Sequence, residues 1–330
     1  MKALLLAGGF GTRLRPLTLT RPKPLLPVYN RPHIAHVFDL LQRHGVDEAV
    51  LLTSYLASTF DYLVEEAAEA GMVLEVSQEK EPLGTAGALK HAEAFVGGET
   101  FLVFNADVLT TADVGALVDF HRAKGAEGTI LLTPVEDPSM YGVVPTDDDG
   151  RVTAFVEKPP PGEAPTNLIN AGVYVLEPSV LDRIPAGEPW SIERATFPQL
   201  VASGAGLYAL RSDSYWIDIG TPEKYLQANL DALHGRVDLL GTLNDDSHVA
   251  ADARVSFSCL GYGVSVRSGA RVSDSVLLPG VTVGEGAEVH RSILGEGVQV
   301  APGAVVEGRT VGDHEIAPAG SAGGTEEVEG

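Results

Sequence analysis

The sequence is poor in cysteine, in positive charge and in long apolar runs. Its single cysteine, Cys259, excludes an intramolecular disulfide and suits a reducing, cytoplasmic location. No apolar run is long enough to cross a bilayer, and the first residues lead directly into a core strand, so we expect no membrane span and no signal peptide. Lysine and arginine number 23 against 45 acidic residues, and the net charge of −22 argues against binding to nucleic acid or anionic membranes.

The rest of the composition is that of an ordinary globular protein. Hydrophobic residues make up 44% of the chain and charged residues 21%. With 330 residues the chain can bury a sizeable core, and we expect two domains. An anionic ligand of so acidic a protein must be met by a local cluster of positive charge.

Such a cluster lies at the start of the chain, in residues 2–28. Residues 3–7 form an apolar run with the length of one buried parallel strand, and Gly8, Gly9 and Gly11 then let the backbone turn tightly near a ligand. No acidic residue appears before Asp39. A basic, glycine-rich loop that leaves a strand indicates a bound polyanion. Its basic residues are Arg13, Arg15, Arg21 and Lys23.

Two better-known glycine loops do not fit this stretch. It lacks the Gly-Lys-Ser/Thr ending of a Walker A loop, and Leu14 stands where a dinucleotide-binding fingerprint needs its third glycine. The spacing therefore disfavours a nicotinamide dehydrogenase. A tight strand-to-helix connection without a ligand is the other alternative, which the flanking charges disfavour.

The segment LLLAGGFGTRLRPLTLTRPKPLLPV closely resembles the signature of the sugar-nucleotidyltransferases, which make NDP-sugars from sugar 1-phosphates. Within that family it is most similar to the mannose-1-phosphate guanylyltransferases. The resemblance continues through further motifs as far as the run WIDIG at Asp218. It implies an enzyme that joins GTP and mannose 1-phosphate to give GDP-mannose and pyrophosphate by an in-line displacement that requires Mg²⁺.

The pattern of strands and helices predicts an α/β fold. Strand and helix signals alternate over residues 31–125, which is typical of a Rossmann-like, mostly parallel sheet flanked by helices, with ligands beyond the carboxyl ends of the strands. A hairpin with an Asp149-Gly150 turn follows, and Thr221-Pro222 begins another helix. We expect a catalytic domain over residues 1–234, a linker over 235–245, a β-helix over 246–316 and a disordered tail over 317–330.

A repeat marks the C-terminal part. Ser258, Ser275 and Ser292 begin copies 17 residues apart, and apolar residues recur about every six positions within each copy. This spacing predicts a short left-handed parallel β-helix of the hexapeptide type, with about four coils. An exposed coil end could mediate self-association into a homo-oligomer.

The resemblance assigns the phosphate chemistry to the opening loop. Arg13 would hold the triphosphate and the departing pyrophosphate, and Lys23 would face the α-phosphate and the sugar phosphate. Arg15 and Arg21 either belong to the same field or are solvated surface charges. The full nucleotide-binding set implied by the resemblance is Leu6, Ala7, Gly8, Gly9, Gly11, Thr12, Arg13, Glu79, Pro82, Gly84 and Thr85.

Two aspartates at strand ends, Asp107 and Asp218, would hold Mg²⁺ by the same resemblance. One or two carboxylates together with substrate phosphates are how proteins usually bind this ion. Taken alone, a strand-end aspartate is more often a turn or a helix cap, and Asp107 is placed to cap a helix near Thr111.

Base choice depends on Glu79, in the run SQEKEPLGTAG. Guanine presents adjacent N1–H and N2–H donors that one carboxylate can accept, whereas an amide suits thymine and uracil. Glu79 therefore favours guanine, and the alternative is an exposed acid in a charged loop, as we expect for Glu81.

The sugar phosphate would be held by Asp107, Gly142, Glu157, Lys158 and Asn170. The resemblance gives Glu157 and Asn170 to sugar hydroxyls and Lys158 to the phosphate, with Gly142 allowing close backbone approach. We expect Trp216 to pack in the core rather than stack on a base.

Two alternatives remain open from the sequence. One is a glucose-1-phosphate thymidylyl- or uridylyltransferase on the same scaffold, against which Glu79 argues. The other is a non-catalytic regulatory subunit that binds GDP-sugar, which would have lost phosphate or metal ligands. Arg13, Lys23, Asp107 and Asp218 are all present.

Overall fold

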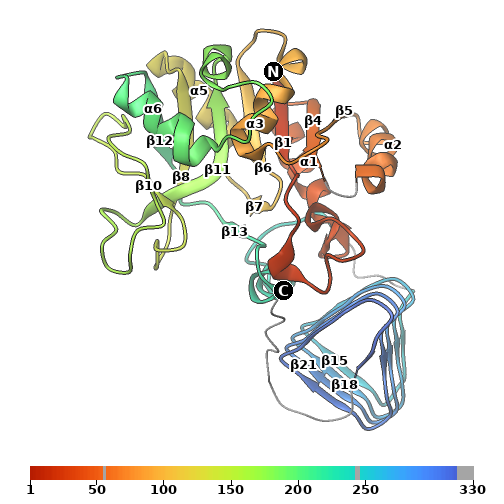
Figure 1. Ribbon diagram of the computed structural model, residues 1–330. Helices are drawn as coiled ribbons and strands as arrows, with labels where there is room; N and C mark the ends of the chain where they lie inside the picture. The colour runs from red at the N-terminus through yellow and green to blue at the C-terminus, as the bar shows by residue number, and fades with distance from the viewer. Residues whose placement is uncertain (55–56, 242–245, 318–330) are drawn as a thin grey trace. The chain divides into compact units, whose positions relative to one another are not determined.

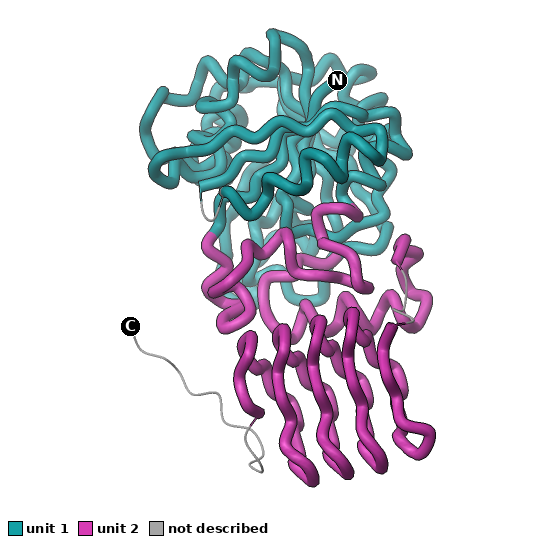
Figure 2. The backbone as a smooth tube through the Cα atoms, turned by 90° about the vertical axis from the view of Figure 1, so that its right-hand side faces the viewer, with its two compact units in different colours: residues 1–9, 37–216 teal, residues 10–36, 217–330 magenta. Residues whose placement is uncertain are grey.

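The computed structural model (Figure 1) describes residues 1–54, 57–241 and 246–317. The chain divides into two compact units. Unit 1 comprises residues 1–9 and 37–216, and unit 2 comprises residues 10–36 and 217–330 (Figure 2). The glycine-rich loop therefore begins in unit 1 and continues along the chain into unit 2. None of the helices among the described residues combines the length and apolarity needed to cross a bilayer.

A nine-stranded sheet forms the centre of unit 1. Its strands are β1 (Lys2–Leu6), β4 (Glu48–Thr53), β5 (Val73–Gln78), β6 (Phe101–Asn105), β8 (Gly128–Pro134), β9 (Gly142–Val143), β10 (Val156–Glu157), β11 (Leu168–Leu176) and β12 (Leu207–Arg211). The order is β10-β9-β11-β6-β1-β4-β5, and β8 joins β11 to β12. Strands β5, β4, β1 and β6 are parallel, as are β8 and β12, whereas β11 is antiparallel to β6 and β8. The predicted mostly parallel sheet is confirmed.

Helices cover the sheet because both of its faces are apolar. Neighbouring residues Leu4 and Leu5 of β1 point to opposite faces, and both are fully buried. Leu4 belongs to a cluster that includes Leu89 and Phe197 from two different helices. The helices are α1 (His33–Arg43), α2 (Asp61–Glu69), α3 (Gly84–His91), α4 (Glu93–Val96), α5 (Val114–Lys124), α6 (Phe197–Ala202) and the short helices η3 (Ala57–Phe60), η4 (Pro178–Arg183) and η5 (Ile192–Thr196).

Local signals in the sequence fix several element ends. The predicted hairpin is confirmed, since β9 pairs with β10 and Gly150 donates its N–H to the carbonyl of Asp147 at 3.1 Å. Asp113, not Asp107, caps α5, because its carboxylate accepts the N–H of Ala116 at 2.8 Å. The helix-cap alternative for Asp107 is therefore wrong, and Asp107 lies between β6 and β7 (Val108–Thr110).

Unit 2 joins residues 10–36 to a helix and a β-helix. Its first part contains η1 (Thr12–Leu14), η2 (Lys23–Leu25), β2 (Pro27–Val28) and β3 (Arg31–Pro32). Strand β13 (Trp216–Asp218) leads from unit 1 to α7 (Pro222–Leu233), whose predicted cap is confirmed by a bond from the N–H of Lys224 to the Thr221 hydroxyl. The phenol of Tyr225 in α7 donates to the carbonyl of Pro27 at 2.6 Å, which ties α7 to the first part.

The predicted β-helix is confirmed as three stacks of short parallel strands. The first stack is β14 (His248–Val249), β17 (Ser265–Val266), β20 (Thr282–Val283), β23 (Gln299–Val300) and β26 (Ile316–Ala317). The second is β15 (Arg254–Ser256), β18 (Arg271–Ser273), β21 (Glu288–His290) and β24 (Val305–Glu307). The third is β16 (Cys259–Leu260), β19 (Val276–Leu277), β22 (Ile293–Leu294) and β25 (Thr310–Val311).

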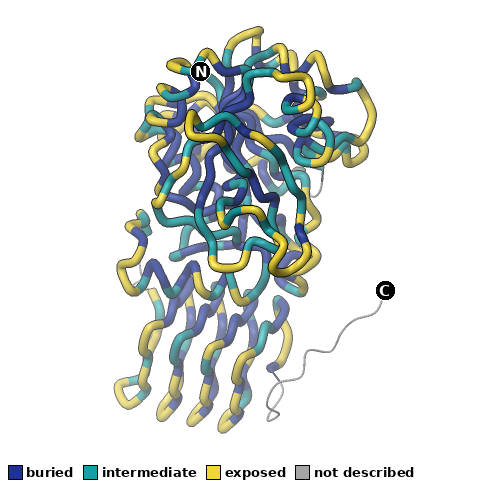
Figure 3. The backbone as a smooth tube through the Cα atoms, turned by 90° about the vertical axis from the view of Figure 1, so that its left-hand side faces the viewer, coloured by how far each residue is buried: buried dark blue, intermediate teal, exposed yellow. Residues whose placement is uncertain are grey.

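The repeat of 17 residues is also the register of the stacks, since Val249, Val266, Val283 and Val300 are successive partners. At one corner the Ser258 hydroxyl accepts the N–H of Ser275, and the Ser275 hydroxyl accepts the N–H of Ser292. Buried and exposed stretches recur at the same places in successive coils (Figure 3). Strand β26 ends at Ala317, and the rest of the expected tail lies outside the described residues.

Candidate active site

The carboxyl ends of four parallel strands meet at one edge of unit 1. Leu6 at the end of β1 pairs with Leu52 and with Asn105, and Thr53 pairs with Gln78. The chain runs from β1 outward to β4 and β5, then returns to β6 on the other side of β1. This reversal is the switch point at which open α/β sheets bind ligands.

The nucleotide-binding residues predicted at the end of β1 are held at this edge. Ala7 donates its N–H to the Leu52 carbonyl at 2.9 Å, and the Ser54 hydroxyl donates to the Gly8 carbonyl at 2.8 Å. Gly9 is exposed. The backbone of the opening loop thus leaves the sheet with Gly9 open to solvent.

Glu79 follows β5 at the same edge and is buried, with 5% of its surface exposed. Its Oε2 accepts the N–H of Leu83 at 3.0 Å. Burial raises the pKa of Glu79, against the lowering effects of the Leu83 N–H and of His91. Glu81 is exposed, as expected. The alternative of Glu79 as an exposed surface acid is therefore wrong.

The loop after Glu79 is pinned by a segment that the sequence analysis did not identify, residues 190–193. A Cβ on Gly84 would lie 2.9 Å from the Trp190 carbonyl oxygen, so only glycine allows this approach. The Thr85 hydroxyl donates to Glu193 at 2.8 Å and accepts the N–H of Ile192 at 2.9 Å. Thr85 thus fixes the loop from inside, while Pro82 is exposed.

Asn170 lies at an irregularity of β11, where the register with β8 shifts between Asn170 and Tyr174. Its amide donates to the Tyr174 hydroxyl at 2.8 Å, and its oxygen accepts the N–H of Gly172 at 2.9 Å. Gly172 has φ of 75°, and a Cβ there would lie 2.7 Å from the Asn105 Nδ2. Strand irregularities of this kind often re-aim side chains next to active sites.

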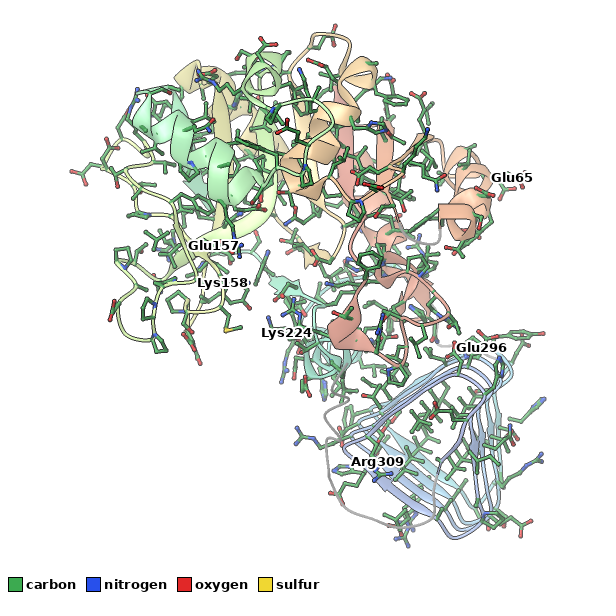
Figure 4. The ribbon with its side chains drawn as sticks, viewed as in Figure 1. Glu65, Glu157, Lys158, Lys224, Glu296 and Arg309 are labelled. Atoms are coloured by element: carbon green, nitrogen blue, oxygen red, sulfur yellow. The ribbon has the colours of Figure 1, made fainter. Side chains whose placement is uncertain are left out.

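Glu157 ends the short strand β10 and Lys158 follows it; both are labelled in Figure 4. Burial and the charge of Glu193 raise the pKa of Glu157, and Lys158 and Arg194 oppose the shift. Lys158 has φ of 50°, a left-handed conformation that non-glycine residues rarely adopt outside functional or strained positions. A Cβ on Gly142 would lie 2.8 Å from the Phe155 ring and 3.0 Å from Glu157 Oε2.

Trp216 links two of these motifs. Its indole N–H donates to the Ala171 carbonyl at 2.9 Å, and its ring meets Tyr141 edge-on at 5.7 Å. Trp216 packs against other protein groups but is only half-buried, so the expectation that it lies in the core is wrong. Asn105, which the sequence analysis did not single out, has a buried Oδ1 without a partner among the described residues.

A second group of charged residues lies within unit 2. A Cβ on Gly220 would lie 3.0 Å from Asp218 Oδ2 and 3.1 Å from Arg13 Nη2, so both side chains lie against this glycine. Lys224 forms an ion pair with Asp218. Lys224 was missed because its position in the first turn of α7 is accounted for by helix formation alone.

The rest of the opening loop folds around Gly11. A Cβ on Gly11 would lie 3.4 Å from the Cβ of Lys23, and the Thr18 hydroxyl donates to the Gly11 carbonyl at 2.8 Å. Lys23 is 9% exposed, whereas Thr12 and Arg13 in η1 are exposed. The loop thus presents Arg13 to solvent and holds Lys23 within the fold.

Arg21 does not lie in this group. Its guanidinium pairs with Glu296 at 2.7 Å and with Asp313 at 3.1 Å, both on the β-helix. The alternative of Arg21 as a solvated surface charge is therefore wrong, because its side chain is 19% exposed and pairs with two carboxylates, whereas Arg15 is exposed.

The carboxylates Asp107 and Asp218 are the donor type that Mg²⁺ prefers. Asp218 already balances the ammonium group of Lys224, which shows that its carboxylate can hold a cation. Within the described ranges no three His, Cys, Asp or Glu side chains are grouped to hold a metal ion. Each carboxylate taken alone is the kind of donor that Mg²⁺ shares with bound phosphates.

The sequence of this chain matches two protein families and several known proteins. Residues 2–235 match the nucleotidyl transferase family, and residues 240–317 match a GlmU-like, C-terminal hexapeptide family. The chain is 42% identical over 234 residues to a mannose-1-phosphate guanylyltransferase of Mycobacterium tuberculosis, over 71% of this chain and 65% of that protein. It is 40% identical over 284 residues to mannose-1-phosphate guanylyltransferase 1 of Arabidopsis thaliana, over 79% of this chain and 78% of that protein.

These matches thus span 65% and 78% of the two relatives' own lengths. Among solved structures, HddC from Yersinia pseudotuberculosis in complex with GMP-PN is 29% identical and has a TM-score of 0.60, over 69% of this chain and 97% of that chain. A putative glucose-1-phosphate thymidylyltransferase from Bacillus anthracis, 24% identical with a TM-score of 0.65 over 73% of this chain and 97% of that chain, shares the fold.

Proposed function

Because this chain belongs to the nucleotidyl transferase family, we propose that it transfers a guanylyl group from GTP to mannose 1-phosphate and releases pyrophosphate. The observation that carries the proposal is the basic glycine-rich loop, which leaves β1 at the switch point of the sheet. The names of relatives that are 40% and 42% identical support the substrates. A structural neighbour in complex with GMP-PN supports a guanine nucleotide.

The reaction joins two anions, so positioning and charge neutralisation are its main requirements. A phosphate oxygen of mannose 1-phosphate attacks the α-phosphorus of GTP, and the bond from that phosphorus to the bridging oxygen of the β-phosphate breaks. We assign Arg13 to the triphosphate and the leaving pyrophosphate, and Lys23 to the α-phosphate and the sugar phosphate. When bound, Mg²⁺ supplies Lewis-acid polarisation and a template, and Asp107 and Asp218 would hold it.

The buried carboxylate of Glu79 is the residue we assign to the guanine base. One of its oxygens accepts the Leu83 N–H, and each carboxylate oxygen has two lone pairs, so further donors can be accepted. A base that presents two adjacent N–H donors complements such a group. Thymine and uracil present one donor between two acceptors and do not.

We assign the sugar 1-phosphate to residues along β9, β10 and β11. Asn170 and Glu157 would bind hydroxyls, and Lys158 would bind the phosphate. The close packing of Gly142 against Phe155 and Glu157 supports the need for glycine at that position.

The cytoplasmic location and the homo-oligomer remain predictions from the sequence.

A grid of four NTPs against mannose 1-phosphate and glucose 1-phosphate tests the proposal, with pyrophosphate release as the readout. We expect turnover with Mg²⁺ to be highest for GTP with mannose 1-phosphate, and EDTA to abolish it. Preference for UTP or dTTP with glucose 1-phosphate would replace the proposal by the alternative transferase. Absence of turnover in every combination would favour the regulatory subunit.

A further inference from the structure

An ion-pair cluster joins the opening loop to the β-helix, entirely within unit 2. Asp313 accepts three hydrogen bonds, from the Thr20 hydroxyl at 2.5 Å, the Arg21 guanidinium at 3.1 Å and the backbone N–H of Glu296 at 2.7 Å. Its side chain is 5% exposed, and that of Arg21 is 19% exposed. Glu296 lies at a corner of the β-helix (Figure 4) and contributes the second carboxylate to Arg21.

The loop meets the β-helix at other points. A Cβ on Gly312 would lie 3.0 Å from the Cβ of Pro16, so the backbone next to Asp313 packs directly on the loop. The Asn30 amide donates to the Leu260 carbonyl at 2.8 Å, which fixes the far end of residues 10–36 to the first coil. The β-helix thus holds this segment at both its middle and its end.

We propose that Asp313 is a positioning residue for nucleotidyl transfer, which acts through Thr20 and Arg21 to fix the loop that carries Arg13 and Lys23. This inference rests on the proposed function. Thr20 and Arg21 lie between Arg13 and Lys23 in the chain, so the anchor divides the loop into two short spans. A short, doubly anchored span samples fewer conformations than a free loop of the same composition.

The chemistry of the cluster suits this role. A buried arginine is always charged and presents donors in a fixed fork, so two carboxylates can define its orientation. Removal of the Asp313 carboxylate would leave Arg21 paired with Glu296 alone, whose side chain is 45% exposed, so the guanidinium would no longer be fixed from two sides. Exposed pairs contribute little, and the β-helix provides one for comparison. Arg271 and Glu288 are 3.0 Å apart, with side chains 66% and 48% exposed.

The first test compares Asp313→Asn and Arg21→Gln with Glu288→Gln as the matched control. For the two anchor variants we expect a loss of roughly 10- to 100-fold in kcat/KM for GTP. We expect this loss to arise from a higher KM for GTP, and we expect the Ki for pyrophosphate to rise as well. Partial unfolding would lower kcat and leave KM and Ki unchanged. The double variant Asp313→Asn/Arg21→Gln is expected to lose no more than either single variant, because the two act as one anchor.

The second test needs no substrate, so it separates failure of this inference from failure of the proposed function. Arg15, Arg21, Lys23 and Arg31 each precede proline, and trypsin does not cleave before proline, so Arg13–Leu14 is the cleavable bond in residues 10–32. We expect this bond to be cleaved at least about tenfold faster in Asp313→Asn than in the wild type or Glu288→Gln. Equal cleavage, or equal KM and Ki values in all three proteins, would overturn the inference.

Discussion

Replacement of Glu79 by glutamine measures what one buried carboxylate contributes to base choice. Glutamine keeps an oxygen that can accept the Leu83 N–H, which now bonds Oε2 at 3.0 Å. It puts an NH₂ group where the other carboxylate oxygen stood, so donors of the guanine base would face donors of the protein. We expect kcat/KM for GTP to fall by about 1–3 kcal/mol, or roughly 5- to 150-fold. Relative use of UTP should rise.

The same substitution should not destabilise the fold at neutral pH. Burial raises the pKa of Glu79 above its ordinary value of 4.5. A raised pKa in the folded state means that the contribution of this group to stability is full below the unfolded pKa and is lost as the pH rises through the folded pKa. Ionisation of this buried carboxylate therefore lowers the stability of the fold, and glutamine removes that cost.

The assay is pyrophosphate release with each NTP, with thermal unfolding followed in parallel. Glu81→Gln is the control, because Glu81 is exposed on the same loop. An unchanged kcat/KM for GTP in Glu79→Gln, or an equal fall in Glu81→Gln, would refute the role of Glu79 in base recognition. A fall accompanied by a lower melting temperature would refute the stability argument.

Two further predictions concern other parts of the site. Gly172→Ala should destabilise the fold by about 1–3 kcal/mol in denaturant unfolding, because φ of 75° and the 2.7 Å approach to Asn105 both oppose a Cβ. Gly162→Ala is the control, because Gly162 has φ of 80° but open space around a Cβ, so only the backbone conformation opposes the substitution. An equal loss of stability in both variants would show that the contact with Asn105 contributes nothing. Asp218→Ala should abolish Mg²⁺-dependent turnover without a change in secondary structure by circular dichroism. The control is Asp213→Ala, which removes an exposed partner of Arg211 and should leave turnover unchanged. Wild-type turnover in Asp218→Ala would contradict a role of Asp218 in metal binding.

Much of the fold follows from local and periodic signals. The spacing of Ser258, Ser275 and Ser292 is the register of the β-helix, so the repeat alone predicts which residues stack. Thr221 caps α7 as its position in the sequence predicts. The cap of α5 is not the one that the sequence suggests, because strand β7 follows Asp107 and Asp113 caps the helix instead.

Contacts between distant segments could not be predicted in this way. No periodic signal links Thr85 to Glu193, although that bond fixes the loop after Glu79. The sequence likewise gives no sign that Arg21 reaches the β-helix, because its partners Glu296 and Asp313 are surrounded by other acids with no such role. The burial of Glu79 depends on packing after β5, which composition alone does not report.

The central claim is that cationic side chains of the opening loop gather the phosphates of both substrates. Steady-state pyrophosphate release by Arg13→Met with GTP, mannose 1-phosphate and Mg²⁺ tests it most directly. Loss of one preorganised group that stabilises transition-state charge typically costs about 10²–10³ in rate, and we expect a fall of that size with an unchanged melting temperature. Wild-type turnover by Arg13→Met would contradict the account.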